Sequence, residues 1–424
     1  IDAVFEEPLL ACAILFAQQR VNYSVPRLSD IRTVKSPGVK FFEKQSSFLK
    51  QKFKGQASPI VALNTYKENI VLPFEKALVN ERNKFVELRA SEQAKSLRHV
   101  FFAERKAREF LKVSTTKDDC CEMVAIIGGG TMGTGIATRL LLSGYKVCLF
   151  EIDKNIRKNA FKNIVLNLDG AVKRAKIDQT QKNIFIKNFH IINEINEVAT
   201  SDLVIEAIVE DMHEKSKVFR LLDGIMKRGA ILATNTSYLD LNQIADVTER
   251  PEYVLGLHFF SPAHIMPLLE IVNGKYTSEQ TLAFGFYLAK KMKMIGVKSV
   301  ACEGFIGNRI LEKTRQAALS LIADGAMPWS IDKAMESFGM RMGPFRVMDM
   351  AGLDIAWARR KEKMKDHVRG QRYVAIADRI CERGWLGRKV GRGWYKYDQH
   401  YPNGSPDPEI ERMIIDYSRE NDIQ

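Results

Sequence analysis

The sequence contains little cysteine, and its cysteines are scattered. Its 424 residues include six cysteines without a C-x-x-C pair, so we expect neither a disulfide framework nor a structural zinc site. The seven histidines are also dispersed along the chain and form no metal-binding pattern. The sequence therefore favours a reducing compartment and predicts no bound metal.

Long hydrophobic runs are also missing. No stretch approaches the roughly 18 uncharged apolar residues of a membrane helix, so we expect no membrane association. The longest candidate, Pro8–Ala17, follows Glu6 and Glu7, and an ordinary signal peptide carries positive charge there. The first residue is Ile rather than Met, which indicates a processed chain or a fragment.

Motifs for nucleic-acid binding are absent although the chain is basic. Its formal net charge is +13, which suits either nucleic acid or phosphorylated small molecules. The sequence has neither zinc-finger spacing nor an aromatic RNP pattern. We therefore expect no nucleic acid partner.

Three zones follow one another along the chain. Residues 1–117 carry apolar residues at helical spacing, so we expect a mostly helical N-terminal region with a polar linker at Ser114–Asp119. Residues 118–299 alternate strand-like and helix-like patterns, which is typical of a parallel, doubly wound α/β domain of the Rossmann type. Residues 300–424 lose the strand signal and predict an all-α C-terminal domain.

The apolar patterns also place individual elements. Strands are expected at Met123–Ile127, Lys146–Phe150, Leu203–Ala207, Ala230–Thr234, Val254–Phe259 and Leu268–Val272. Helices are expected at Thr131–Ser143, Gly307–Ile322 and Ile331–Phe338.

A glycine pattern follows the first predicted strand. Gly128, Gly130 and Gly133 satisfy G-x-G-x-x-G between a strand and a helix, which is the context of a dinucleotide site. Gly128 permits the tight turn, Gly130 lets the backbone approach a pyrophosphate, and Gly133 allows close packing of helix and strand. Thr131 and Met132 begin the helix, whose unpaired N–H groups favour phosphate.

Glu151 at the end of the second predicted strand indicates which dinucleotide is bound. A carboxylate there accepts hydrogen bonds from a ribose 2′-hydroxyl and repels a 2′-phosphate, so NAD is preferred over NADP. Lys154 and Arg157 follow closely and weaken this preference. The glycine pattern alone leaves two alternatives open, namely FAD and a glycine turn without a ligand.

Three polar residues lie in or just after the predicted strands. Ser237 follows Ala230–Thr234, and His258 lies near the end of the next strand. Ligands of open α/β sheets bind beyond the carboxyl ends of the strands, so both residues are suitably placed for chemistry. Glu270 is expected among buried apolar neighbours and needs a partner. On the pattern alone, a hydrogen-bonded core histidine and a structural ion pair are alternative interpretations.

Several segments around these residues carry a family resemblance: Val124–Asp153, Ser201–Lys215, Asn235–Ser237, Gly256–His264, Leu268–Val272, Gly304–Arg309, Met342–Asp349 and Leu386–Tyr397. They resemble the 3-hydroxyacyl-CoA dehydrogenase family, especially the branch found in peroxisomal bifunctional enoyl-CoA hydratase/3-hydroxyacyl-CoA dehydrogenases. The similarity covers essentially residues 121–424.

The resemblance implies NAD-dependent oxidation of (3S)-3-hydroxyacyl-CoA to 3-oxoacyl-CoA in fatty-acid β-oxidation. His258 matches the general base of the family, and Glu270 matches the carboxylate that orients it. Ser237 and Asn308 match the polar residues that hold the C3 oxygen of the substrate. Since Asn308 belongs to the second domain, the resemblance also implies that the domains close over the substrate.

The resemblance implies further ligand contacts. Glu210 and Lys215 resemble family residues near the nicotinamide ribose. Lys173 and Arg174 lie with Lys176 in a basic cluster that resembles the region where family members hold the CoA phosphates. A solvated basic helix face is the alternative interpretation of this cluster.

The sequence departs from the family at Tyr238, where the family usually has a small residue. A bulky ring there is expected to narrow the substrate pocket or to shift Ser237. Residues 1–117 resemble the tail of the hydratase half and its linker helix, without the hydratase's catalytic glutamates, so we expect no hydratase activity. The chain carries one copy of the C-terminal helical domain, through which we expect a homodimer.

The resemblance implies a peroxisomal location, with a cytoplasmic one as the alternative, because the chain ends in Asn421–Gln424 rather than Ser-Lys-Leu. One rival hypothesis is a catalytically silent NAD- or acyl-CoA-binding protein with an interaction or regulatory role. The joint presence of Ser237, His258, Glu270 and Asn308 argues against it. Another rival is a Rossmann dehydrogenase for a small hydroxy acid, which the His-Phe-Phe-Ser-Pro motif at His258 disfavours.

Overall fold

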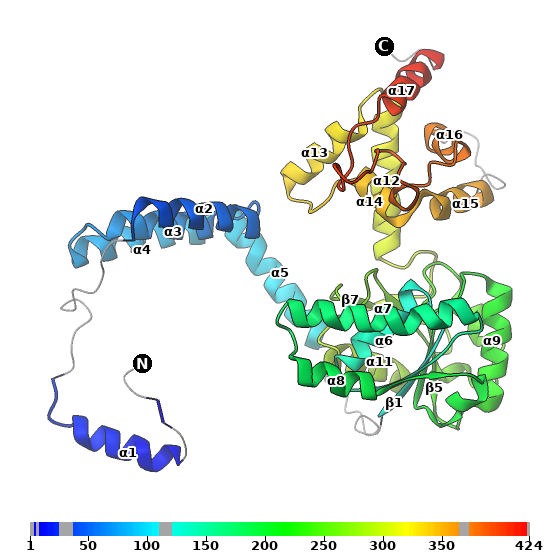
Figure 1. Cartoon of the computed structure of the whole chain (residues 1–424), viewed down its shortest axis with the longest axis horizontal. Helices are drawn as coiled ribbons and strands as arrows, with labels where there is room; N and C mark the ends of the chain where they lie inside the picture. Colours follow the sequence, from blue (N-terminus) through cyan, green and yellow to red (C-terminus); the bar gives the residue numbers. More distant parts are fainter. Residues whose placement is uncertain (1–3, 6–7, 25–36, 110–120, 364–372, 422–424) are drawn as a thin grey trace. The chain divides into compact units, whose positions relative to one another are not determined.

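The computed structural model describes residues 4–5, 8–24, 37–109, 121–363 and 373–421. They divide into a helical N-terminal unit up to Arg98 and a larger unit that comprises nearly all of the chain from His99 onward. The larger unit contains an eight-stranded sheet and a helical C-terminal domain (Figure 1). The predicted boundary at residue 117 and the predicted linker at Ser114–Asp119 lie in 110–120, outside the described residues.

The N-terminal region is helical, as the spacing of its apolar residues predicts. Its helices are α1 (Leu9–Arg20), α2 (Val39–Lys52), α3 (Ser58–Asn69), α4 (Phe74–Ala90) and α5 (Glu92–Glu109). The Asn80 amide on α4 donates to the Asn69 side-chain oxygen at 2.8 Å, and α3 packs against both α2 and α4. In the described part of the chain, no helix has the length and apolarity needed to cross a membrane.

The middle of the chain forms the sheet and the helices that cover it. The elements are β1 (Met123–Ile127), α6 (Thr131–Leu141), β2 (Lys146–Phe150), α7 (Lys154–Lys173), α8 (Gln179–Lys187), β3 (Phe189–Ile192), η4 (Ile195–Thr200), β4 (Leu203–Glu206), α9 (Met212–Ile225), β5 (Ile231–Thr234), α10 (Leu241–Ala245), η5 (Pro251–Tyr253), β6 (Val254–Phe259), β7 (Leu268–Asn273), α11 (Glu279–Lys291) and β8 (Ile295–Val300).

The strand order is β3-β2-β1-β4-β5-β6-β7-β8. All neighbours pair in parallel except β6 and β7, which are antiparallel. The segment 260–267 that joins them is too short for the crossover helix that a parallel pair needs. The first six strands have the order of the Rossmann fold, so the predicted fold class is confirmed.

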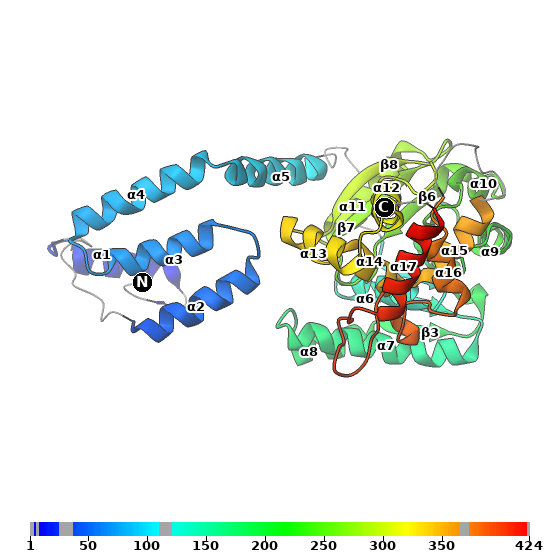
Figure 2. The same ribbon diagram turned by 90° about the horizontal axis from the view of Figure 1, so that it is seen from above.

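Helices cover both faces of this sheet (Figures 1 and 2). On β1, Val124 and Ile126 face one apolar cluster, which includes side chains of α6, α7 and α11. Ala125 and Ile127 face the other cluster, which includes side chains of α9 and α10. A strand buried on both faces needs a continuous apolar run, and this explains why β1 does not alternate with polar residues.

The predicted strands agree with the observed ones to within one residue at each end. Two observed strands were not predicted. They are the two edge strands of the sheet: β3 has only four residues and includes His190, and β8 includes Gly296 and Lys298. Both strands owe their conformation to pairing with a neighbour rather than to their own pattern.

The C-terminal domain is helical, as predicted, apart from isolated bridges between residues 387 and 405. Figure 2 shows it from above in yellow to red. Its elements are α12 (Gly307–Ala323), α13 (Pro328–Phe338), α14 (Pro344–Ala351), α15 (Leu353–Lys363), α16 (Ile376–Glu382), η7 (Arg388–Val390) and α17 (Pro408–Glu420). The side chains of Phe345 and Trp394 are fully buried in its core, with ring centroids 4.7 Å apart.

A buried carboxylate joins α14 to the segment after η7. Asp349 accepts hydrogen bonds from the backbone N–H of Trp394 at 2.9 Å and of Tyr395 at 3.0 Å, and from the Tyr397 hydroxyl at 2.9 Å. Burial raises the pKa of Asp349 to about 6, although these three donors act in the opposite direction. The carboxylate therefore fixes a segment that has few regular backbone hydrogen bonds.

Removing this carboxylate should weaken the C-terminal domain. Asp349→Ala leaves three donors without their acceptor, so we expect the free energy of unfolding at pH 7 to fall by about 3 kcal/mol. Chemical denaturation measures this change. The matched control is Asp416→Ala on the exposed face of α17, which should change stability by less than about 0.5 kcal/mol. Equal stabilities of the two variants would contradict the assigned role.

The contribution of Asp349 should also depend on pH. Because its folded-state pKa of about 6 lies above the ordinary value of 3.8, the folded state binds this proton more tightly than the unfolded state. Its stabilising contribution is therefore largest below the ordinary value and falls as the pH rises through the folded-state value. The difference in unfolding free energy between wild type and Asp349→Ala should decrease over this range. Urea titrations at several pH values test this, and a constant difference would refute it.

Candidate active site

The protein's own packing explains two glycines of the loop after β1. Gly128 has φ +109°, and a Cβ there would lie 2.6 Å from the Ala207 carbonyl oxygen. A Cβ on Gly133 would lie 1.9 Å from the carbonyl oxygen of Gly128. The turn and the packing of α6 on β1 therefore exclude any side chain at these two positions.

Gly130 is different, because no protein atom lies within 4 Å of the place where its Cβ would stand. Its backbone is extended, with φ −69°, so any residue can adopt it. Thr131 and Met132 follow in the first turn of α6, where N–H groups lack helical partners. An open approach to these groups fits a bound pyrophosphate.

Glu151 lies directly after β2 and contacts this loop. Its carboxylate accepts hydrogen bonds from the Gly129 N–H at 2.7 Å and from the Asp153 N–H at 2.9 Å. Arg157 donates to the Glu151 backbone carbonyl and to Asn193, each at 2.8 Å. The negative charge therefore stands beside the glycine loop, and the nearby cation is held by neutral oxygens. This arrangement fits the 2′-hydroxyl of NAD.

The antiparallel register of β6 and β7 brings His258 and Glu270 together. The two residues are direct cross-strand partners, and the Nδ1 of His258 lies 2.5 Å from Oε2 of Glu270. Both are almost completely buried, with exposures of 3% and 1%. A carboxylate accepts hydrogen bonds, so Nδ1 is the donor in this pair.

The other oxygen of Glu270 faces the C-terminal domain. It accepts hydrogen bonds from the N–H of Ile306 at 3.0 Å and of Gly307 at 2.8 Å, at the start of α12. The unpaired N–H groups of a helix N-terminus favour a negative charge. A Cβ at Gly307 would lie 2.8 Å from the Phe260 ring, so any other residue there would displace that ring. Three donors thus compensate the burial of Glu270.

Aromatic rings enclose the imidazole. The ring centroids of Phe260 and Phe305 lie 4.6 Å and 5.4 Å from that of His258. Phe305 has φ +48°, an uncommon conformation for a non-glycine residue. These rings reduce the access of water to the pair, which strengthens its electrostatic interaction.

The loop after β5 carries Ser237 to the same place. The Asn235 side-chain oxygen accepts a hydrogen bond from the Phe259 N–H at 2.9 Å and so ties this loop to the end of β6. The Asn308 amide on α12 lies 3.5 Å from the Ser237 carbonyl oxygen. The structure therefore places the Ser237 loop beside Asn308 and beside the end of the strand that carries His258, and the roles predicted for Ser237, His258, Glu270 and Asn308 stay predictions.

Glu210 organises the backbone of this loop. One of its oxygens accepts hydrogen bonds from the Thr236 hydroxyl at 2.6 Å, from the Ser237 N–H at 2.7 Å and from the Tyr238 N–H at 3.0 Å. Lys215 lies 3.4 Å from the other oxygen. Glu210 thus fixes the loop from the side of the sheet domain.

Lys215 itself is buried, with 1% of its surface exposed. Its Nζ donates to Glu206 at 2.6 Å, and Glu206 also accepts from the Thr234 hydroxyl at 2.7 Å. A buried ion pair requires such additional hydrogen bonds. The predicted ribose contacts of Glu210 and Lys215 remain predictions, and the structure shows that both residues also support the Ser237 loop.

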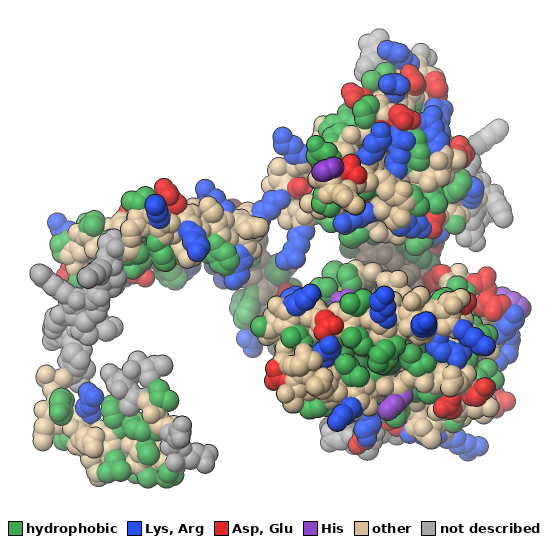
Figure 3. Space-filling model, viewed as in Figure 1, with side chains coloured by type: hydrophobic (Ala, Val, Ile, Leu, Met, Phe, Trp, Pro, Cys, Tyr) green, Lys and Arg blue, Asp and Glu red, His purple; other side chains and the backbone are tan. Residues whose placement is uncertain are grey.

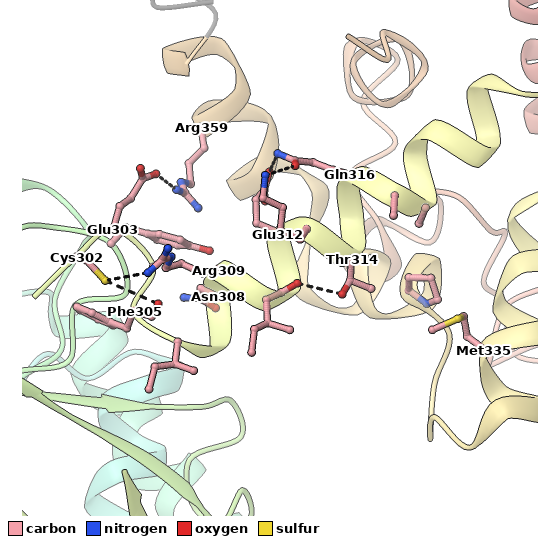
Figure 4. A pocket seen from close by; sticks show the side chains of 18 of the residues that line it. Cys302, Glu303, Phe305, Asn308, Arg309, Glu312, Thr314, Gln316, Met335 and Arg359 are labelled. Carbon is pink, nitrogen blue, oxygen red and sulfur yellow. Dashed lines mark hydrogen bonds and ion pairs between the residues drawn. The ribbon is translucent and has the colours of Figure 1, made fainter. Parts of the chain in front are cut away.

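A cavity of about 1130 Å³ adjoins Asn308 (Figure 4). Tyr238, Glu303, Asn308 and Arg359 are among its polar and aromatic lining residues. Apolar lining comes from α12 and α13, including Leu321, Ile331 and Met335. Polar and charged residues of α12, including Arg309, Glu312 and Gln316, also line it, so the cavity suits a ligand with both apolar and polar parts.

Lys173 and Arg174 lie exposed at the C-terminal end of α7. In Figure 3, Lys and Arg side chains are scattered among hydrophobic, acidic and other side chains on this side of the sheet domain. Burial lowers the pKa of the neighbouring His264, and the positive charges of Arg174, Arg139 and Lys176 lower it further. Arg174, Arg139 and Lys176 therefore lie near His264, and the roles predicted for Lys173 and Arg174 remain predictions.

Sequence reasoning missed the residues that support the site. Asn235 and Thr236 were singled out only as part of a motif, and Glu206 was not considered. The N–H groups of Ile306 and Gly307 could not be recognised from the sequence, because they belong to the backbone, although Gly307 lies in one of the segments that resemble the family.

The described residues contain no group of three or more His, Cys, Asp or Glu that could hold a metal.

A doubly wound sheet with this glycine loop, and with a histidine–carboxylate pair at neighbouring strand ends, defines a class of dinucleotide-dependent dehydrogenases. Comparison with known families agrees. The model of the NAD binding domain of 3-hydroxyacyl-CoA dehydrogenase matches residues 123–302, and that of the C-terminal domain matches residues 304–397. The chain belongs to the 3-hydroxyacyl-CoA dehydrogenase family, and its cofactor is NAD.

Among curated proteins, the peroxisomal bifunctional enzyme of Cavia porcellus is 36% identical over 446 residues, which cover 100% of this chain and 61% of that protein. The peroxisomal bifunctional enzyme of Homo sapiens is 38% identical over 371 residues, or 83% of this chain and 51% of that protein. The chain thus spans between half and two thirds of the length of these relatives.

Solved structures show the same fold. The crystal structure of FadB2 from M. tuberculosis has 31% identity and a TM-score of 0.62, and the match covers 66% of this chain and 100% of that one. (S)-3-hydroxybutyryl-CoA dehydrogenase PaaH1 from Ralstonia eutropha has 30% identity, a TM-score of 0.62 and the same coverage.

The same change to alanine, made separately at Gly130 and at Gly133, should affect cofactor binding in one variant and protein stability in the other. Gly130→Ala should fold normally because its Cβ meets no protein atom, but it should weaken NADH binding about 10-fold by obstructing the pyrophosphate. Gly133→Ala should instead lower the free energy of unfolding by about 2 kcal/mol, because the new Cβ would displace the backbone of Gly128. NADH fluorescence titration measures the affinity for NADH, and thermal unfolding measures the stability. Unchanged NADH affinity in Gly130→Ala would exclude this loop as the site.

Proposed function

We propose that this chain oxidises (3S)-3-hydroxyacyl-CoA to 3-oxoacyl-CoA with NAD in fatty-acid β-oxidation. The observation that supports this most strongly is the buried His258–Glu270 pair beside the Ser237 loop. A proton acceptor oriented by a carboxylate, near a dinucleotide loop, suits the removal of a hydroxyl proton together with a hydride.

His258 is the proposed general base. Because its Nδ1 donates to Glu270, its Nε2 is the nitrogen that takes the proton of the 3-hydroxyl group. NAD, when bound, supplies the acceptor for the hydride that leaves C3. The C3–O bond then becomes a carbonyl, and the proton on Nε2 is later released to solvent. In the reverse direction, the same nitrogen returns the proton.

Glu270 stabilises the charged imidazole. Its negative charge stands 2.5 Å from Nδ1, so it favours the imidazolium that forms when His258 takes the proton. The N–H groups at the start of α12 hold this carboxylate in place. The general base thus acquires its orientation and its electrostatic support from one residue.

Ser237 and Asn308 are the proposed ligands of the C3 oxygen. Hydrogen bonds that are already aligned cost little reorganisation when charge develops on that oxygen. Glu210 holds the Ser237 loop through three donors, and Asn308 approaches the same loop from α12. The substrate therefore lies where the sheet domain and the C-terminal domain meet.

The basic cluster at the end of α7 is the proposed contact for the CoA phosphates. Lys173 and Arg174 supply positive charge, with Arg139 and Lys176 nearby.

We also propose a peroxisomal location for this chain, because the related bifunctional enzymes of Cavia porcellus and Homo sapiens are peroxisomal enzymes. The homodimer expected through the C-terminal domain stays a prediction.

Loss of the general base should abolish turnover. His258→Gln should reduce the rate of 3-oxoacyl-CoA reduction about 1000-fold, because general acid–base catalysis contributes roughly that much. NADH absorbance measures the rate with acetoacetyl-CoA and with a longer homologue. NADH binding should be preserved, because the glycine loop and Glu151 are unchanged.

The control is His190→Gln, because His190 is an exposed histidine on β3, and it should retain wild-type turnover. A wild-type chain that binds NADH but turns over neither substrate would overturn the proposal. That result would support the catalytically silent NAD- or acyl-CoA-binding protein instead.

A further inference from the structure

An arginine of the C-terminal domain covers the residue that follows Ser237. The guanidinium carbon of Arg359 on α15 lies 3.3 Å from the ring centroid of Tyr238. The same guanidinium donates to Glu303 at 2.6 Å, and Figure 4 shows Arg359 reaching toward that carboxylate. Only 22% of the Arg359 side chain is exposed. We call Tyr238, Arg359 and Glu303 the latch.

The latch connects three segments that meet at the proposed substrate site. Tyr238 belongs to the loop after β5, Glu303 to the segment between β8 and α12, and Arg359 to α15. The Tyr238 ring also lies against Gly304, since a Cβ there would be 3.4 Å from the ring. Tyr238, Glu303, Arg359 and Asn308 line one cavity.

The Ser237 loop is therefore held from two sides. Glu210 of the sheet domain accepts from the Ser237 and Tyr238 N–H groups. From the other side, Arg359 covers the Tyr238 ring, and Asn308 approaches the Ser237 carbonyl oxygen at 3.5 Å. The Asn308 contact is long for a hydrogen bond, so a further contact is needed to fix the position of the loop relative to α12.

Arginine suits this position better than lysine. A planar guanidinium can stack on an aromatic ring and pair with a carboxylate at its edge at the same time. A lysine ammonium is a compact and strongly hydrated charge, which makes one of these contacts at the expense of the other. The geometry of the latch uses both properties of arginine.

We propose that the latch positions Ser237 against Asn308 for hydride transfer. This inference rests on the proposed dehydrogenase function. Tyr238, Arg359 and Glu303 are positioning residues, which act through Ser237 and Asn308 and do not contact the reacting atoms. The large ring at position 238, where a small residue is usual in the family, provides the surface that Arg359 covers.

The main test is the kinetics of Arg359→Ala. Small displacements of positioning groups reduce turnover strongly, so we expect kcat for 3-oxoacyl-CoA reduction to fall roughly 10- to 100-fold. KM for NADH should stay unchanged, because the glycine loop lies on other elements. Arg359→Lys should recover only part of kcat, and Tyr238→Phe, which keeps the ring, should keep most of it. An Arg359→Ala variant with wild-type kcat would overturn the proposal.

Coupling between the two stacked residues gives a second test. If Arg359 acts by holding Tyr238, the double variant Tyr238→Ala, Arg359→Ala should lose no more activity than the more impaired single variant. Two independent residues would instead give losses that multiply. Multiplied losses would therefore refute the latch even if both single variants are impaired.

A matched control exists elsewhere in the same domain. Arg379 pairs with Glu420 at 2.6 Å and lies 5.4 Å from the Tyr417 ring centroid, which repeats the chemistry of the latch away from the cavity. Arg379→Ala should leave kcat unchanged. A loss of kcat in this control equal to that of Arg359→Ala would attribute the effect to general destabilisation and contradict the proposal.

Hydrogen exchange separates failure of the latch from failure of the proposed function. Arg359→Ala should accelerate amide exchange in residues 235–239 and 303–309, and Arg379→Ala should not. This readout needs no turnover. Unchanged exchange in both segments would refute the latch, whereas accelerated exchange in a chain without activity would retain the latch as a structural connection and reject the dehydrogenase.

Discussion

The carboxylate of Glu270 is the interaction on which the rest of the site depends. One oxygen holds Nδ1 of His258 across the β6–β7 pair, and the other accepts two N–H groups at the start of α12. A buried carboxylate that loses its donors is costly. The antiparallel strand pair, the imidazole and the first turn of α12 therefore stabilise one another. A single charge orients the proposed base and joins the sheet domain to the C-terminal domain.

Charged residues also support the loop that carries Ser237. Glu210 holds the loop backbone, and Lys215 with Glu206 supports Glu210 from the strand ends. Glu206 and Lys215 are buried and compensate each other, which is the condition for burying a charge, whereas Glu210 is exposed. The site thus consists of a few polar residues in apolar surroundings, each supported by another.

The features predicted well from the sequence are those encoded locally. The apolar run of β1 and the glycine loop lie within a dozen residues, and both were found where expected. The pairing of His258 with Glu270 depends on the direction and register of β6 and β7, which the apolar pattern does not specify. The family resemblance, rather than the pattern, indicated that pair. Arg359 lies more than 100 residues from Tyr238 along the chain, and no periodic signal connects them.

The glycine at position 307 has a consequence for exchanging domains between relatives. Because a Cβ there would meet the Phe260 ring at 2.8 Å, a chimera that takes its helical domain from another protein must either retain a glycine at this junction or displace the ring that packs against His258. It must also present two backbone amides to Glu270 at the same place. The turn before α12 therefore has to stay with the sheet domain when domains are exchanged. A fusion point after this turn would keep the two N–H groups that bind Glu270, and with them the orientation of His258. A fusion point before the turn would leave these N–H groups to be supplied by the incoming domain.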